Sequence, residues 1–113
     1  MEVAVRLLLA TNALFELAVA ARSVLVGLAA TSLDATHLVL GANALALSVL
    51  SLLMLPATDP QWRRRGLQVF TVFHWSVTAA WIVVATGGSL NPALIAHGVF
   101  ALAFTAALSR SAT

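Results

Sequence analysis

Cysteine and tyrosine are absent from this sequence, and charged side chains are scarce. The absence of cysteine excludes a disulfide framework, a thiolate metal site and a cysteine nucleophile, and it leaves the redox compartment undetermined. A metal or haem site would therefore have to use histidine and carboxylate ligands. No spacing motif for such a site is present, and we expect neither a metal nor a cofactor.

Charged residues make up 9% of the chain, whereas hydrophobic residues make up 61%. With a mean hydropathy of +0.99, the sequence lies far outside the usual range of soluble domains and is typical of a membrane protein. The net charge of +2 comes mostly from Arg63, Arg64 and Arg65. These arginines form no basic groove and the chain has no DNA-binding motif, so we expect no nucleic acid among its partners.

Four apolar segments account for nearly the whole chain, and each is near the ~20 residues needed to cross ~30 Å of hydrocarbon. They cover residues from about 4–30, 36–55, 67–86 and 92–109. Because they continue to the end of the chain, we expect the first to be retained rather than cleaved as a signal. Short connections make sequence neighbours pack antiparallel. The sequence therefore predicts an all-α membrane protein, a single transmembrane domain over residues 1–113 that forms an up-down-up-down four-helix bundle.

Residues that end or begin helices separate these segments. The breaks contain Asp34, the run from Pro56 to Pro60, and the run from Gly87 to Pro92. Asp34 and Asn91 are candidate N-caps, and Pro92 suits the first position of a helix. The first and last breaks also share Ser-Leu followed by Asp or Asn, a short sign of duplication.

The connection at residues 56–66 indicates the orientation of the chain, because it contains Trp62 and the three consecutive arginines. The positive-inside rule places such a loop in the cytoplasm. Both termini then also lie in the cytoplasm, in agreement with Arg6 and Arg110 near the two ends. We therefore expect an integral protein of the cytoplasmic (inner) membrane of a bacterium.

Glu16 lies near the middle of the first apolar segment, with Asn12 one helical turn earlier on the same face. A carboxylate at this depth costs ~3 kcal/mol on insertion scales, so an ionisable group in the membrane is a functional-site hypothesis by default. Glu16 is therefore predicted to be a catalytic acid or base. The alternative is a protonated carboxyl group that only hydrogen-bonds a neighbouring helix.

Residue counts from the outer loops, at about 1.5 Å per residue, give two polar layers. The deeper layer lies ~17 to 22 Å from the outer helix ends and contains Glu16, Ser48 and His74. The shallower layer lies ~8 to 13 Å from them and contains Arg22, Asn43 and His97. The layers predict a polar pocket in the outer half of the bundle, ringed by Phe70, Phe73, Trp75, Trp81, Phe100 and Phe104.

His74 shares a helical face with Thr71, Thr78 and Trp81. Since histidines in membranes usually face the protein interior or a cavity, His74 is predicted to be the catalytic partner of Glu16. A structural hydrogen bond between helices is an equal alternative for His74, and the same two interpretations apply to His97.

Six residues are predicted to bind the substrate: Asn12, Arg22, Asn43, Trp75, Trp81 and His97. Arg22 is ~120° from Glu16 around the helix, so the two side chains are not expected to pair. The alternative to substrate binding is that the Arg22 side chain extends to the outer membrane surface. For Asn43 the alternative is an interhelical hydrogen bond. His37 is expected to be interfacial.

The Phe73-His74-Trp75 stretch and the Asn91-Pro92 turn before Ala96-His97-Gly98 resemble the small four-helix membrane proteins of the DoxX-like, DUF4345 and, more distantly, Erg28-like type. By analogy with related sterol isomerase bundles, this resemblance implies an acid-base enzyme that acts on a lipidic substrate.

In length, in its four helices and in one membrane glutamate, Glu16, the chain is also similar to the small multidrug resistance family. That resemblance implies a homodimeric exporter in which Glu16 binds both proton and cargo. The tyrosine and the Trp-Gly pattern of that family's third helix are missing, as is its Trp-Pro loop, and the arginine-rich loop favours one fixed orientation.

We therefore expect a membrane-embedded pocket that binds a hydrophobic small molecule and performs acid-base chemistry on it, such as isomerisation, cyclisation or epoxide opening. A proton-coupled exporter is one alternative, and a membrane scaffold or subunit without catalysis is the other. Membrane lipid is expected as a partner in each case.

Overall fold

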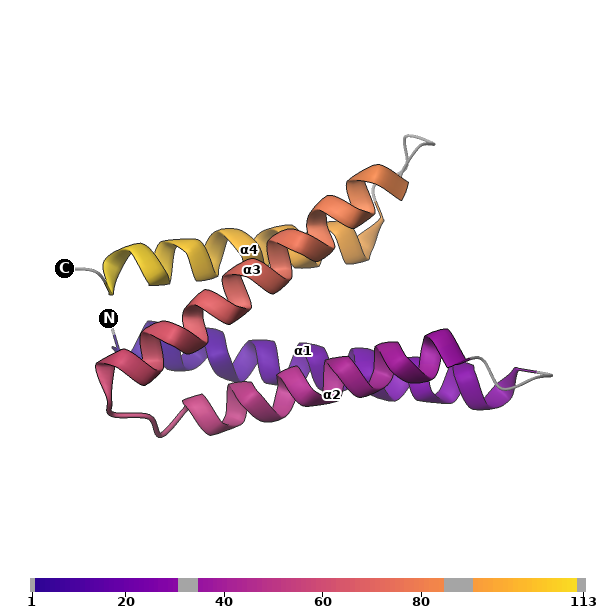
Figure 1. Ribbon diagram of the computed structural model, residues 1–113, viewed down its shortest axis with the longest axis horizontal. Coiled ribbons are helices and arrows are strands. Elements are labelled where there is room, and N and C mark those ends of the chain that lie inside the picture. The colour runs from indigo at the N-terminus through magenta and orange to yellow at the C-terminus, as the bar shows by residue number, and fades with distance from the viewer. Residues whose placement is uncertain (1, 31–34, 85–90, 112–113) are drawn as a thin grey trace. The chain divides into compact units, whose positions relative to one another are not determined.

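The computed structural model describes residues 2–30, 35–84 and 91–111. It contains four helices, α1 (Glu2–Ala29), α2 (Ala35–Met54), α3 (Pro60–Val84) and α4 (Pro92–Arg110). The chain divides into two compact units, Met1–Pro56 and Ala57–Thr113. Each unit is an antiparallel helical hairpin, formed by α1 with α2 and by α3 with α4 (Figure 1). The predicted all-α class is confirmed, and the antiparallel pairing of sequence neighbours is present in both hairpins.

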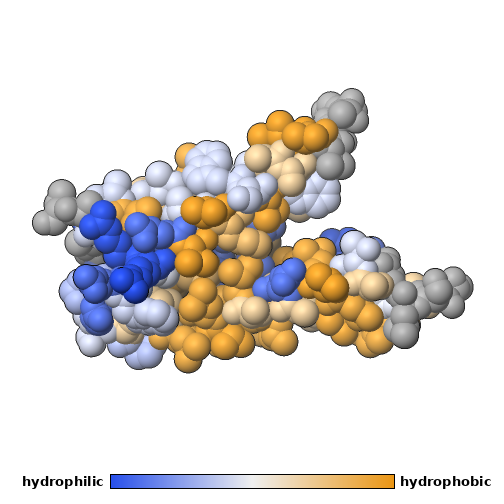
Figure 2. Space-filling view, viewed as in Figure 1, coloured by the Kyte–Doolittle hydropathy of each residue, from blue (hydrophilic) through white to orange (hydrophobic). Residues whose placement is uncertain are grey.

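All four helices are long and apolar enough to cross a membrane. The shortest, α4, has 19 residues, which at about 1.5 Å per residue reaches nearly the thickness of the hydrocarbon core. Large apolar side chains on the helix surfaces are exposed, among them Leu14 at 70% and Val83 at 74%. Orange, hydrophobic residues cover much of the helical surface in Figure 2. An exposed apolar surface of this extent is suited to lipid, and the chain is an integral membrane protein.

The third helix begins earlier than the sequence indicated. We expected a loop over residues 56–66, but α3 starts at Pro60. The Asp59 carboxylate accepts hydrogen bonds from the backbone N–H groups of Gln61 at 2.8 Å and Trp62 at 3.4 Å. Asp59 is thus the N-cap, and Pro60 occupies a position that needs no backbone donor. The prediction was wrong because the Asp-Pro pair begins a helix here. The three consecutive arginines therefore lie in the first turns of α3.

Replacing Asp59 with alanine is expected to destabilise the protein by ~1 kcal/mol, because two backbone donors of α3 lose their acceptor. Asp59→Asn, which keeps a side-chain oxygen, should lose less. Equilibrium unfolding in mixed detergent micelles, followed by circular dichroism, measures both, with the exposed neighbour Thr58→Ala as control. An equal loss in Thr58→Ala and Asp59→Ala would show that the cap contributes nothing.

The predicted start of the fourth helix is confirmed. Asn91 is the N-cap of α4, its side-chain oxygen accepts from the Ala93 N–H at 2.9 Å, and Pro92 follows it. The other predicted cap, Asp34, lies outside the described residues, as does most of the two similar outer turns.

Small residues let the helices of the first hairpin approach closely. A Cβ atom added at Gly41 would lie 2.9 Å from Val24 Cγ2 and 3.2 Å from the backbone oxygen of Ala20. The buried residues of α2 are Gly41, Ala44, Ser48, Ser51 and Met54. Their spacing of three and four residues defines the face of α2 that packs against α1, with little room for a larger side chain.

Replacing Gly41 with alanine is expected to destabilise the protein by ~1 to 3 kcal/mol, because the added methyl group meets backbone as well as side chain. Gly98 in α4 is the matched control, since a Cβ there meets nothing closer than Thr78 Cγ2 at 3.9 Å. Gly98→Ala should change the free energy of unfolding by no more than ~0.5 kcal/mol. Similar values for the two variants in detergent unfolding would contradict the close approach at Gly41.

Candidate functional site

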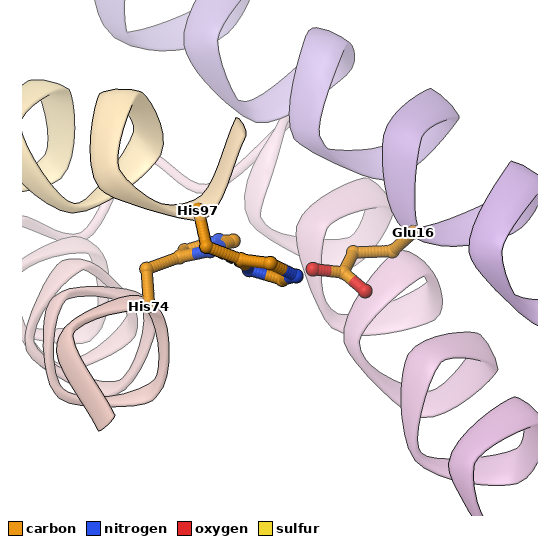
Figure 3. Close-up of side chains that lie close together, drawn as sticks. All are labelled: Glu16, His74 and His97. Atoms are coloured by element: carbon orange, nitrogen blue, oxygen red, sulfur yellow. Dashed lines mark hydrogen bonds between the residues drawn. The ribbon is translucent and has the colours of Figure 1, made fainter. Parts of the chain in front are cut away.

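Helices α3 and α4 each contribute one buried histidine to the contact between them. His74 and His97 are 0% and 7% exposed, and their Nδ1 atoms lie 3.0 Å apart, within hydrogen-bonding distance (Figure 3). The expectation that these histidines lie at different depths is therefore wrong. The depth estimate assumed that the outer ends of both helices lie at one level and that the helix axes are not inclined to each other. In the structure α3 and α4 cross (Figure 1).

Three phenylalanine rings surround this histidine pair. The His74 imidazole stacks on Phe100, with centroids 5.1 Å apart and planes at 21°, and on Phe104, at 5.5 Å and 9°. The Phe73 ring makes T-shaped contacts with His74, at a centroid distance of 5.1 Å, and with His97, at 6.0 Å. Stacked and edge-on rings at these separations attract each other and fix the ring planes. We call the two histidines and the three phenylalanines Phe73, Phe100 and Phe104 the histidine cluster.

The hydrogen bond restricts where protons lie on the two rings. A neutral imidazole has one N–H and one lone pair, so one Nδ1–H donates and the other Nδ1 accepts. In a neutral pair, the donating ring then has a lone pair at Nε2, and the accepting ring has its proton at Nε2. The pair therefore combines one base and one acid, the two functions that proton-transfer catalysis needs.

The threonines on the predicted His74 face bond within their own helix. Thr71 donates to the carbonyl of Leu67, and Thr78 donates to the carbonyl of His74, each at 2.7 Å. Hydroxyl groups that donate to a carbonyl of their own helix contribute to local structure and do not indicate a catalytic role.

Of the two tryptophans predicted to bind substrate, Trp75 lies on another face of α3 than His74, whereas Trp81 is seven residues from His74 and shares its face. Trp75 is 43% exposed, and its indole N–H donates to the Thr105 hydroxyl at 3.0 Å. Trp81 is half-buried. In an α-helix, Trp75 is rotated by about 100° from His74, which turns it toward the outer surface of the hairpin.

The first hairpin contains the buried Glu16, which is 1% exposed on α1 and is labelled in Figure 3. One turn before it, the Asn12 amide donates to the Ser51 hydroxyl at 2.9 Å. The Ser48 hydroxyl donates to the carbonyl of Ala13 at 2.8 Å. Asn12, predicted to bind substrate, thus joins α1 to α2. Sequence reasoning missed Ser51, although it lies three residues from Ser48 on one face of α2.

Arg22 and Asn43 are exposed, so they are not among the buried polar groups of the first hairpin. Asn43 is two residues from Gly41, or about 200° around the helix, and therefore lies opposite the face that packs on α1. Arg22 is likewise two residues from the buried Ala20, about 200° around α1. His37 is half-buried at the start of α2. Residue counting gave the height of these side chains along the helix but not their direction.

Comparison of the chain with protein-family models, with curated proteins and with solved structures gives no match. The resemblances to the DoxX-like type and to the small multidrug resistance family stay predictions, and function has to be argued from the residues themselves.

Proposed function

We propose that the protein binds a largely apolar small molecule within the membrane and catalyses proton transfer on it, in an isomerisation, a cyclisation or an epoxide opening. His74 and Glu16 are the catalytic acid-base residues, and the reaction needs no cofactor. The observation that carries the proposal is the hydrogen bond between His74 and His97 inside the histidine cluster. It provides an acid and a base in an apolar surrounding.

Packing alone gives little reason to keep this pair. Hydrogen bonds between membrane helices contribute only ~0.6 kcal/mol on average. Phenylalanine or leucine would fill a site lined by aromatic rings without any polar atom to satisfy. Two buried histidines in such a site therefore favour a chemical role, and the aromatic rings packed around them favour an apolar molecule.

Glu16 supplies a second kind of acid-base group. It is the buried carboxyl group of α1, whereas Glu2 on the same helix is exposed and accepts a hydrogen bond from Arg6 at 2.7 Å. A carboxyl group shielded from water can hold or release a proton during a reaction in a way that an exposed, ion-paired one cannot. We therefore assign proton exchange to Glu16 and none to Glu2.

The proposed location is the cytoplasmic membrane of a bacterium, with both termini in the cytoplasm. In the second hairpin, Arg63, Arg64 and Arg65 lie at the beginning of α3, and Arg110 lies in the last turn of α4. Antiparallel packing brings these turns to the same end of the hairpin. A basic end of this kind is retained on the cytoplasmic side.

A proton-coupled exporter is the second candidate, favoured by the burial of Glu16 in the first helix. It would act as a homodimer and depend on the pH gradient. The enzyme is preferred because proton and cargo exchange at Glu16 alone leaves the hydrogen-bonded histidine pair in the third and fourth helices without a role.

Mass spectrometry of small molecules that co-purify with the protein tests the proposal. Wild type and Glu16→Gln are compared at matched folding, with Glu2→Gln as the control for removal of a carboxyl group elsewhere on α1. The expected result is one defined hydrophobic compound with wild type and Glu2→Gln, and a chemically different, unconverted form of it with Glu16→Gln. Bulk lipid alone in all three samples would overturn the proposal and favour the exporter or a scaffold.

A further inference from the structure

The second hairpin carries an excess of positive charge at one end. Its charged side chains are one acid, Asp59, and four arginines, Arg63, Arg64, Arg65 and Arg110. The arginines lie in the first turns of α3 and the last turn of α4, where blue, hydrophilic residues gather in Figure 2. Because the Asp59 carboxylate caps α3, most of the arginine charge is left for an anion from outside the chain to neutralise.

Two of these arginines are available to such an anion. The Arg63 guanidinium donates to the carbonyl of Ala57 at 2.6 Å. Arg64 and Arg65 are exposed, and neither makes a hydrogen bond or an ion pair with any residue that the structure describes. Their Cα atoms are ~3.8 Å apart, so both long side chains can reach one phosphate group. Guanidinium groups bind phosphate oxygens through paired, charge-assisted hydrogen bonds.

A shallow apolar hollow lies beyond these two arginines along α3. It has a volume of about 430 Å³, only apolar atoms face it, and its lining residues are Gln68, Val69, Val72 and Phe73. Gln68 and Val69 are each four residues beyond one of the arginines, so the hollow begins one turn away on the same side of the helix. This side does not pack on α4, since Val72 is 66% exposed and about 200° from the buried His74.

The order of these groups along α3 matches the order of the groups in a phospholipid. From Leu67 to Val84 the helix is long enough, at ~1.5 Å per residue, to cross most of the ~30 Å hydrocarbon core, which places the arginines at the level of the headgroups. The exposed Trp62 agrees with this level, because tryptophan favours the membrane interface. Gln68 is then at the level of the ester groups. The far side of the hollow, ~10 to 12 Å beyond Arg65, is at the level of the acyl chains.

We propose that Arg64, Arg65 and the hollow form a binding site for one anionic phospholipid. The two guanidinium groups hold its phosphate, and one acyl chain lies along Val69 and Val72. Charge complementarity selects the anionic headgroup, because a zwitterionic lipid brings its own cation toward the arginines. The site goes beyond the proposed function and uses no ring nitrogen of the histidine cluster.

The first test is native mass spectrometry of the protein in detergent after co-purified lipid has been removed. Equal amounts of dioleoyl phosphatidylglycerol and dioleoyl phosphatidylcholine are added, so that the two probes differ only in their headgroups. Wild type should retain one phosphatidylglycerol in preference to phosphatidylcholine, and Arg64→Gln and Arg65→Gln should each lower this preference by ~5-fold. Arg6→Gln is the matched control and should leave the preference unchanged, because the Arg6 charge is already paired with Glu2 at 2.7 Å. Equal retention of both lipids by wild type, or an equal loss of preference in Arg6→Gln, would overturn the site.

The second test concerns the hollow and leaves every charge in place. Val72→Phe fills the hollow, and Val99→Phe on α4 is the matched control, since the two valines are 66% and 61% exposed. Retention of phosphatidylglycerol should fall in Val72→Phe and stay at the wild-type level in Val99→Phe. Unchanged retention in Val72→Phe would overturn the hollow as the place of the acyl chain. A wild-type dimer that binds no phosphatidylglycerol and is dissociated by Val72→Phe would also overturn the site, because a second copy of the chain would then cover this side of α3.

Discussion

Replacing Glu16 with glutamine is expected to lower the rate of conversion of the bound molecule by ~10² to 10⁴-fold, the usual contribution of a general acid or base. Glutamine keeps the size of the side chain and its hydrogen-bonding capacity but cannot exchange a proton at neutral pH. Binding should therefore change little while the rate collapses. The measurement is conversion of the co-purified compound, added back to purified variants in nanodiscs and followed by mass spectrometry.

Glu2→Gln is the matched control for this experiment, because it makes the same chemical change at an exposed site of the same helix. Its rate should equal that of wild type. A Glu16→Gln protein that folds and converts the compound at the wild-type rate would remove Glu16 from the mechanism. The double variant with His74→Gln adds a further check. If the two residues serve one reaction, the double variant should be little worse than the poorer single variant.

The second large effect is on stability, and it concerns the histidine pair. Replacing only one histidine with phenylalanine should destabilise the protein by ~1 to 3 kcal/mol, because the Nδ1 atom of the other loses its partner in a buried site. Replacing both should cost less than the sum of the two single losses, since both Nδ1 atoms of this hydrogen bond are then removed together. The four proteins of this cycle are compared by unfolding in mixed detergent micelles.

This cycle also separates stability from function. A double phenylalanine variant that is as stable as wild type but inactive would show that the pair is retained for chemistry. Additive losses in the double variant, with each histidine contributing on its own, would instead contradict the hydrogen bond that joins His74 to His97.

The fold was largely predictable, because the bilayer leaves few alternatives for a chain this apolar. Segments of membrane length had to be helices, and short connections had to make hairpins. Local chemistry at the helix ends was also informative. Asn91 and Pro92 were correctly interpreted as the beginning of a helix, whereas the equivalent pair Asp59 and Pro60 was taken as part of the helix-ending run that begins at Pro56. Capping depends on the first turn of a helix and is independent of whether that turn lies in lipid.

The site was less predictable, because hydropathy gives the height of a residue in the membrane but not its direction around the helix. Asn43 and Arg22 were at suitable heights and proved to be exposed. The small residues that bring α2 against α1, with Gly41 and Ala44 among them, carried the missing rotational information. The predicted difference in depth between His97 and His74 was wrong for another reason. Because α3 and α4 cross, residues at unequal distances from the outer ends of the two helices come into contact.

The most direct test of the account follows wild-type protein with its co-purified compound in water labelled with deuterium and oxygen-18. Proton-transfer catalysis predicts a stable label in the molecule beyond that found without protein. Carbon-bound deuterium would mark isomerisation or a cyclisation that begins by protonation of carbon, and oxygen-18 would mark epoxide opening by water. A compound that is bound and released with neither label and with no change in structure would contradict a catalytic role for Glu16 and the histidine pair.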